Sequence, residues 1–262
     1  MKRSSRARIS ATLAVSALSL ALITGCSDEG SDDTKGTDAK ESAAASSAPA
    51  AKALTSAELE KLLLAKGDIK GFEAESGDDT LPKSKSDVKT DKAECDPLAW
   101  ATAALAPGDT DANASNTLTA ETSAASKDPS DLSEADLESA FDVSITFVGL
   151  SSYDGDGAEK AVKAVSDGVT ACSGGFGIKA EGENSKVTKV ATAKSSGAGD
   201  ESVAFSEDVD MDGEGTATFL TEVVRKGNTV ATFYSVNLAA LGKGGKTEIP
   251  AEVVTAQVAK LK

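Results

Sequence analysis

The chain has no histidine among its 262 residues and only three cysteines. The missing histidines exclude Ser-His and Cys-His nucleophilic pairs, histidine general bases and histidine metal sites. An enzyme that uses carboxylates alone, as glycosidases do, remains an alternative because Asp and Glu number 42, but abundance does not place two carboxylates together. We interpret the chain as non-enzymatic.

Long apolar runs are also scarce, and the only one lies near the start. Residues 1–25 combine a basic start, an apolar stretch at Ile9–Ile23 and small residues at the end. This order is typical of a secretory signal peptide. The stretch is shorter than the ~20 residues that a membrane-spanning helix needs. The sequence therefore predicts export and removal of residues 1–25.

The end of this segment reads Leu22-Ile23-Thr24-Gly25-Cys26, which resembles the lipobox of bacterial lipoproteins. The resemblance implies a diacylglyceryl group on Cys26, cleavage before it, and attachment to the outer face of the cytoplasmic membrane. Two acyl chains hold a protein on a bilayer where a single one is marginal. The alternative is an ordinary secreted protein in which Cys26 occurs by chance.

Residues 26–53 follow as a polar segment. Positions 27–53 contain no aromatic or branched aliphatic side chain, so this segment cannot form a core. We predict a flexible tether with a reach of roughly 30 Å. Residues 54–262 are long enough for one domain with a sizeable core. We expect this domain to be a monomer.

Acidic residues dominate, with a net charge of −15 that becomes −19 once the four basic residues of the signal segment are removed. Binding to phosphate backbones depends on clustered Lys and Arg, so we expect no nucleic-acid partner. The remaining two cysteines, Cys95 and Cys172, would lie in an oxidising compartment. We predict a disulfide between them, with two buried free thiols as the alternative.

Helix signals occur at four places in the domain. Thr55 and Glu58 form a capping box that predicts a helix ending before Gly67, and Asp96 with Pro97 predicts the cap and first position of a second. A third helix carries an apolar stripe ending at Cys172, and a fourth begins near Pro250. Trp100 is expected in the core.

Strands are predicted at residues 141–150, 187–193, 202–207, 216–225 and 229–237, with a hairpin turn at Lys226-Gly227-Asn228. In the first, Phe141, Val143, Ile145 and Phe147 should face the core and Asp142, Ser144 and Thr146 the solvent. The pattern predicts an α+β domain, in which helices flank an antiparallel sheet.

Several motifs together resemble the PknH-type extracellular sensor domains and their lipoprotein relatives in actinobacteria. They are the capped first helix, Cys95 with Leu98, the helix ending in Cys172, Gly199–Ser202, and the Arg225–Asn228 hairpin. The family has a second disulfide and a tryptophan before the position of Cys172, both of which this chain lacks. The resemblance implies a cell-envelope binding or sensing module.

One acidic segment resembles a cation-binding loop. Asp208, Asp210 and Asp212 precede Gly213 as in an EF-hand, but Phe219 stands where that loop has its bidentate glutamate. We interpret these residues as part of a solvated loop between two strands, with weak calcium binding as the alternative. We expect no other cofactor.

These observations predict a membrane-anchored, extracytoplasmic lipoprotein that binds an envelope component or a protein. The alternative is a lipoprotein that binds a small molecule or a metal and works with a transporter, which requires a closed pocket.

Overall fold

A computed structural model of the chain describes residues 52–76, 81–121, 133, 142–180, 182–211, 215–241 and 247–261. The predicted signal segment, Cys26 and nearly all of the predicted tether lie outside these residues. The boundaries assigned to these segments from the sequence therefore stay predictions. The described residues belong to one compact unit, Ser47–Lys262.

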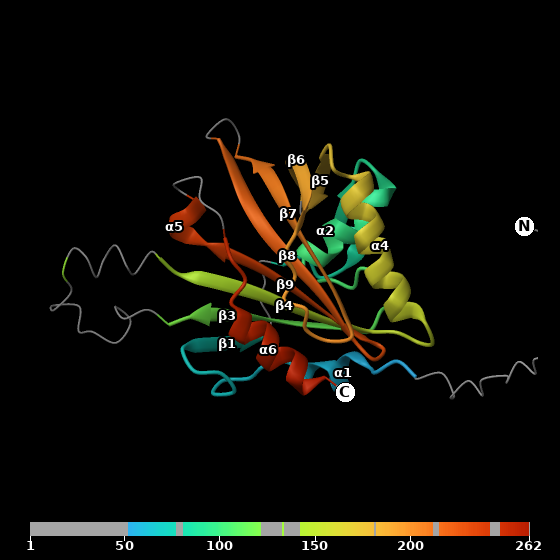
Figure 1. Cartoon of the computed structure of the whole chain (residues 1–262), viewed down its shortest axis with the longest axis vertical. Helices are drawn as coiled ribbons and strands as arrows, with labels where there is room; N and C mark the ends of the chain where they lie inside the picture. The colour runs from blue at the N-terminus through green and yellow to red at the C-terminus, as the bar shows by residue number, and fades with distance from the viewer. Residues whose placement is uncertain are drawn as a thin grey trace, which may run out of the picture. The chain divides into compact units, whose positions relative to one another are not determined.

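A nine-stranded sheet forms the centre of this unit, and all its neighbouring strands are antiparallel (Figure 1). The strand order is β1-β3-β4-β9-β8-β7-β6-β5-β2. The strands, in this spatial order, are Phe72–Ser76, Asn113–Ala120, Ser144–Ser152, Thr229–Asn237, Thr216–Lys226, Glu201–Asp210, Glu183–Ala193, Phe176–Ala180 and Val88–Thr90. The predicted antiparallel α+β architecture is confirmed.

Helices cover both faces of the sheet. The α-helices in the described part of the chain are α1 (Ser56–Glu60), α2 (Asp96–Thr102), α4 (Gly157–Ala171), α5 (Leu238–Leu241) and α6 (Ala251–Lys260). Successive strand residues point to opposite faces. Accordingly, Val223 packs in a core with α2 and α4, whereas Val224 packs in a second core with residues of α1 and α6. No helix in the described ranges is long and apolar enough to cross a membrane.

The local signals for helices and the hairpin are largely confirmed. Both bonds of the capping box form between Thr55 and Glu58, but α1 ends at Glu60 rather than near Gly67. Cys95, not Asp96, occupies the N-cap position of α2, and its side chain makes no capping hydrogen bond. Lys226 pairs with Thr229 across a two-residue turn, in which Gly227 has a φ of 58° that favours glycine.

The prediction for the two faces of β4 was wrong. Thr146 is 0% exposed, together with Val148 and Leu150 on the same face, whereas Ile145 and Phe147 are only partly buried. The Thr146 hydroxyl lies 2.8 Å from that of Ser235, and this hydrogen bond makes its burial tolerable. Because both faces are at least partly covered, alternation of polar and apolar residues does not identify the inner face. Phe141 lies outside the described residues.

The loop after α2 lies directly on the sheet. Ala104 has a φ of 55°, which is uncommon for a residue with a Cβ, and its carbonyl oxygen lies against Gly149 on β4. Any side chain at Gly149 would collide with this oxygen and with the Thr232 hydroxyl. The glycine thus lets the chain between α2 and β3 approach the strand closely.

The predicted disulfide between Cys95 and Cys172 is confirmed, with a Cα–Cα separation of 5.9 Å. Both cysteines are fully buried, one directly before α2 and the other directly after α4. The bond closes a loop across a sequence separation of 77 residues. It therefore connects the two helices that cover one face of the sheet.

Removing this bond through Cys95→Ser with Cys172→Ser should lower the free energy of unfolding by about 4 kcal/mol, because the unfolded chain regains loop entropy. Urea unfolding of the purified protein measures this difference. The Thr170→Ser variant changes an exposed position at the end of α4 and should unfold at the wild-type midpoint. Equal stabilities of the double variant and the wild type would contradict the prediction.

Candidate functional site

Buried polar atoms without a hydrogen-bond partner are rare in folded proteins and call for an explanation at each position. Among the side chains of the described residues there are four such atoms: Trp100 Nε1, Asn113 Oδ1, Asn116 Oδ1 and Glu207 Oε1. Trp100 and Asn113 line the same depression of the surface.

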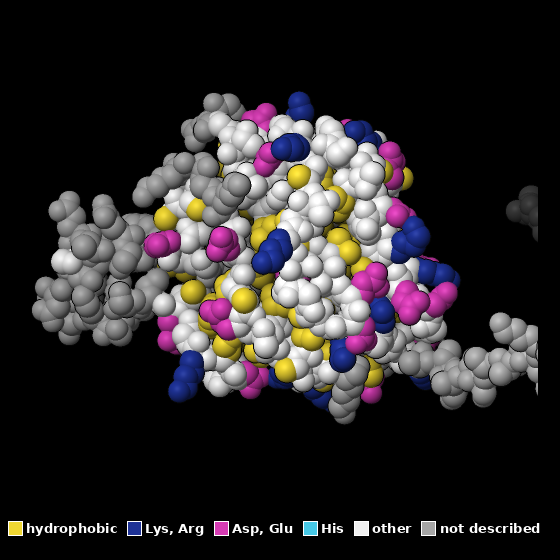
Figure 2. All heavy atoms as spheres, viewed as in Figure 1, with side chains coloured by type: hydrophobic (Ala, Val, Ile, Leu, Met, Phe, Trp, Pro, Cys, Tyr) yellow, Lys and Arg dark blue, Asp and Glu magenta, His cyan; other side chains and the backbone are white. Residues whose placement is uncertain are grey.

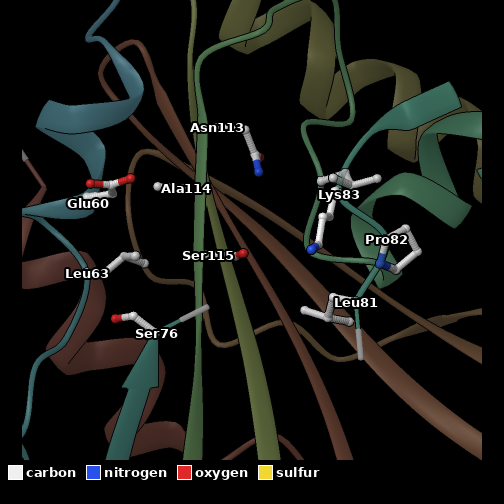
Figure 3. Close-up of a pocket in the computed structure, with 10 residues that line it drawn as sticks. Glu60, Leu63, Ser76, Leu81, Pro82, Lys83, Asn113, Ala114 and Ser115 are labelled. Atoms are coloured by element: carbon white, nitrogen blue, oxygen red, sulfur yellow. The ribbon is translucent and has the colours of Figure 1, made fainter. Parts of the chain in front are cut away.

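The depression consists of two adjoining hollows with cavity volumes of about 420 and 620 Å³. Lys83, Leu105 and Asn113 line both, and we call the pair the β3 groove. Figure 3 shows the first hollow, where Asn113 and Ser115 on β3 and Lys83 on the facing loop point into a shared space. Both volumes lie within the range of small-molecule sites. The groove is half open to solvent.

Lys85 connects the two walls of the groove. Its amine donates a hydrogen bond to the Gly108 carbonyl and lies 5.1 Å from the centre of the Trp100 ring. Burial lowers the pKa of Lys85, while Asp109 and Asp111 oppose that shift. This contact joins the loop at residues 81–87 to α2 and to the segment before β3. The Lys85 amine therefore links the two walls of the groove.

Trp100 was expected in the core, and this prediction is only partly right. Its ring packs against the core between α2 and α4, but the residue is partly exposed and lines the second hollow. Asn113, Ser115 and the residues at 81–86 were not identified from the sequence. The only sequence signal for this groove was Trp100, and a tryptophan gives the same sequence pattern whether it lies in a core or in a groove.

A second unpartnered group lies under α2. Glu207 on β7 is 2% exposed, and its Oε2 accepts a hydrogen bond of 2.9 Å from the Thr102 hydroxyl. The Thr102 and Thr221 hydroxyls lie 3.1 Å apart, and Glu207 Oε1 has no partner. Burial raises the pKa of Glu207 to about 7, and the Thr102 hydrogen bond opposes this shift.

Aromatic rings surround the same region of the sheet. The Tyr234 ring lies 5.9 Å from Phe147 and 5.7 Å from Phe219, measured between centres. Burial and the nearby Glu207 both raise the pKa of Tyr234. Glu207 does not line the β3 groove, so the carboxyl group is a feature of the core and not a wall of the candidate site.

The predicted acidic loop begins later than expected. Asp208 and Asp210 belong to β7, which runs to Asp210, and Asp212 lies outside the described residues. The Asp208 carboxylate accepts a 2.7 Å hydrogen bond from Thr218 on the neighbouring strand. The described residues contain no group of three or more Cys, Asp or Glu that could hold a metal ion. Weak calcium binding stays a prediction, which calorimetry with millimolar calcium tests.

Comparison with known proteins gives a similarity to solved structures alone. No family model and no curated protein matches the chain. The solved structure of the extracellular domain of PknH from Mycobacterium tuberculosis has a TM-score of 0.44 and 13% identity, over 80% of this chain and 97% of that one.

Because burial raises the pKa of Glu207, we expect the free energy of unfolding to fall as the pH rises. The unfolded chain releases this proton near the ordinary pKa of 4.5, whereas the folded chain retains it up to about 7. The contribution of this proton to the free energy of unfolding is therefore fully present below pH 4.5. About 3 kcal/mol of it is lost as the pH rises from 4.5 to about 7. Glu207→Gln should remove this pH dependence and stabilise the protein at pH 8, as measured by urea unfolding across the pH range.

The control for this experiment is Glu183→Gln, which changes an exposed carboxylate at the start of β6. This variant should keep the pH profile of the wild type. A wild-type profile in the Glu207→Gln protein would show that the buried carboxyl group does not titrate near neutrality.

Proposed function

We propose that the mature chain is a lipid-anchored, extracytoplasmic protein that binds a ligand in the β3 groove without catalysing a reaction. The observation that carries the binding role is the pair of adjoining hollows of about 420 and 620 Å³, volumes that suit a small ligand or part of a larger one. Trp100 and Asn113 line the second hollow as partly exposed residues, so aromatic and amide surface is available to a ligand there.

The extracytoplasmic location is supported by two independent features. The signal-like segment ends in the lipobox-like Leu22–Cys26, which gives a route for export and lipid attachment. The buried Cys95–Cys172 disulfide is typical of a protein that folds outside the reducing cytoplasm. Both features agree with a domain on the outer side of the membrane.

Binding is favoured over catalysis by the chemistry of the groove. The chain has no histidine, and Glu207, the carboxyl group with a pKa raised to about 7, does not line either hollow. General acid–base catalysis works best with a group of such a pKa next to the substrate. The groove offers hydrogen bonds and contact area instead.

The alternative of a lipoprotein that delivers a small molecule or a metal to a transporter requires a closed pocket. Both hollows of the groove are half open to solvent, which favours a ligand that extends beyond the site. The surface viewed in Figure 2 carries Lys, Arg, Asp and Glu side chains interspersed rather than gathered by sign. This distribution gives no support for a nucleic-acid partner on that face.

Replacing the lipidation residue tests the anchor. With Cys26→Ser, the protein should leave the membrane fraction or accumulate as the uncleaved precursor, because no thioether can form. Fractionation of the producing cells and mass spectrometry of the intact protein measure location, cleavage and lipid together. Ser31→Ala, in the tether, should remain membrane-bound and carry the lipid mass. Unchanged membrane attachment of Cys26→Ser would exclude the proposed anchor.

A further inference from the structure

The Glu207 carboxyl group is held by one side chain from outside the sheet. The hydrogen bond that it receives from the described residues comes from the Thr102 hydroxyl, which lies 2.9 Å from Oε2. The residue is 2% exposed, and Oε1 has no partner in the described part of the chain. A carboxylate in such a site needs further donors or contact with water, whereas a neutral carboxyl group needs fewer. The closed site therefore suits the protonated form.

The groups that face Glu207 supply no compensating charge. The strands on either side place Val190 and Phe219 opposite it, and α2 contributes Thr102. The buried face of α4 is apolar, and Tyr234 of β9 is the titratable neighbour, whose own pKa is raised by burial and by Glu207. Burial raises the pKa of Glu207 to about 7, and no charge of a described residue contributes.

The helix α2 is the element around Glu207 that depends least on backbone pairing. β7, which carries Glu207, is paired along its length with β6 and β8. In contrast, α2 has seven residues and is attached covalently only at its start, by the disulfide at Cys95. Its other end carries Thr102 and leads into Ala104, whose φ of 55° is uncommon for a residue with a Cβ. The Thr102–Glu207 hydrogen bond thus joins the end far from the disulfide to the sheet.

The same end of α2 shapes the β3 groove. Trp100 lines the second hollow, and Leu105 lines both. The Leu105 amide donates a 2.8 Å hydrogen bond to the Trp100 carbonyl, which couples the two residues. A shift of this helix end away from Glu207 would therefore change the walls of both hollows.

We propose that Glu207 is a pH-sensitive switch: when it releases its proton to solvent, the C-terminal end of α2 separates from the sheet and water reaches the carboxylate. With the proton bound, Thr102 holds the helix end and the groove keeps the shape described above. Water in the open form supplies the donors that the closed form lacks. The switch goes beyond the proposed binding function, because it acts on the shape of the groove whichever ligand binds there.

The direction of the switch follows from the pKa of Glu207 in the two forms. The closed form retains the proton up to about pH 7, whereas a carboxyl group in contact with water approaches the ordinary pKa of 4.5. Rising pH therefore favours opening, by up to about 300-fold across this range, because each pKa unit corresponds to a factor of ten. Unfolding of the whole domain exposes the same carboxyl group and gains the same factor.

Hydrogen exchange of the full mature protein, measured by mass spectrometry, tests the proposal. The reporter amides are those of Ala103, Ala104 and Leu105, whose hydrogen bonds close the end of α2. Wild type and Glu207→Gln are compared at the same pH, so the intrinsic pH dependence of exchange cancels. The ratio of the wild-type rate to the variant rate should rise about twentyfold from pH 5.5 to pH 7.5. Against the control Glu183→Gln, an exposed carboxylate on β6, the ratio should stay constant.

Two results would overturn the switch. One is a ratio to Glu207→Gln that does not change between the two pH values. The other is protection of the α2 amides equal to the free energy of unfolding from urea at the same pH, which would mean that they exchange only when the whole domain unfolds. A local release requires lower protection than that.

The pair Thr102→Val and Thr102→Ser provides a second test that leaves Glu207 in place. The Thr102 hydrogen bond lowers the pKa of Glu207, so its loss in Thr102→Val should extend the rise in α2 exchange to higher pH. The ratio of the Thr102→Val rate to the wild-type rate should then increase above pH 7. Thr102→Ser keeps the hydroxyl and should give a constant ratio. A constant ratio for Thr102→Val as well would show a purely structural bond and would also overturn the switch.

Discussion

The disulfide between Cys95 and Cys172 is the constraint on which the candidate site depends. It attaches the start of α2 to the end of α4, and α4 packs on four strands of the sheet. The short helix α2 has seven residues and could not hold its position by helix propensity alone. It carries Trp100 into the β3 groove and Thr102 to Glu207. Covalent attachment therefore positions both of the unusual polar regions.

Close contact between the loop and the sheet completes this positioning. Gly149 has no side chain, so the Ala104 carbonyl can lie against β4, and the chain then turns towards Asn113 at the start of β3. The Lys85 contacts with Gly108 and Trp100 hold the facing loop at the other wall. A groove formed in this way is preorganised, which reduces the entropy that a ligand must overcome on binding.

The buried Glu207 illustrates how one short helix links separate features. Its carboxyl group has one partner, Thr102, on the same helix that carries Trp100. A carboxylate in such surroundings is costly, so the proton is retained to an unusually high pH. Tyr234 lies close enough to Glu207 for this carboxyl group to raise the pKa of the phenol, so a charge on Glu207 would act on its buried neighbour as well.

The sequence by itself determined the elements whose signals are local. The capping box at Thr55, the apolar stripe of α4 and the Gly227-Asn228 turn depend on neighbouring residues only, and each formed. Pairing of Cys95 with Cys172 also followed, since they are the two cysteines left after Cys26 is assigned to lipid. The antiparallel α+β class followed from the order of these elements.

Only the tertiary structure decided the inner face of β4, the existence of β3 and the groove. The β3 segment, Asn113–Ala120, has Leu118 as its only large apolar side chain, so its apolar alternation is too weak to predict a strand. Ala114 and Leu118 nevertheless pack into the core with α1 and α6, and Asn116 on the same face is buried with a hydrogen bond from its amide to the Leu64 carbonyl. Thr146 is buried because helices cover both faces of the sheet. The groove joins residues 81–86, Trp100 and Asn113, and no local pattern encodes contacts between segments that meet only after the sheet has formed.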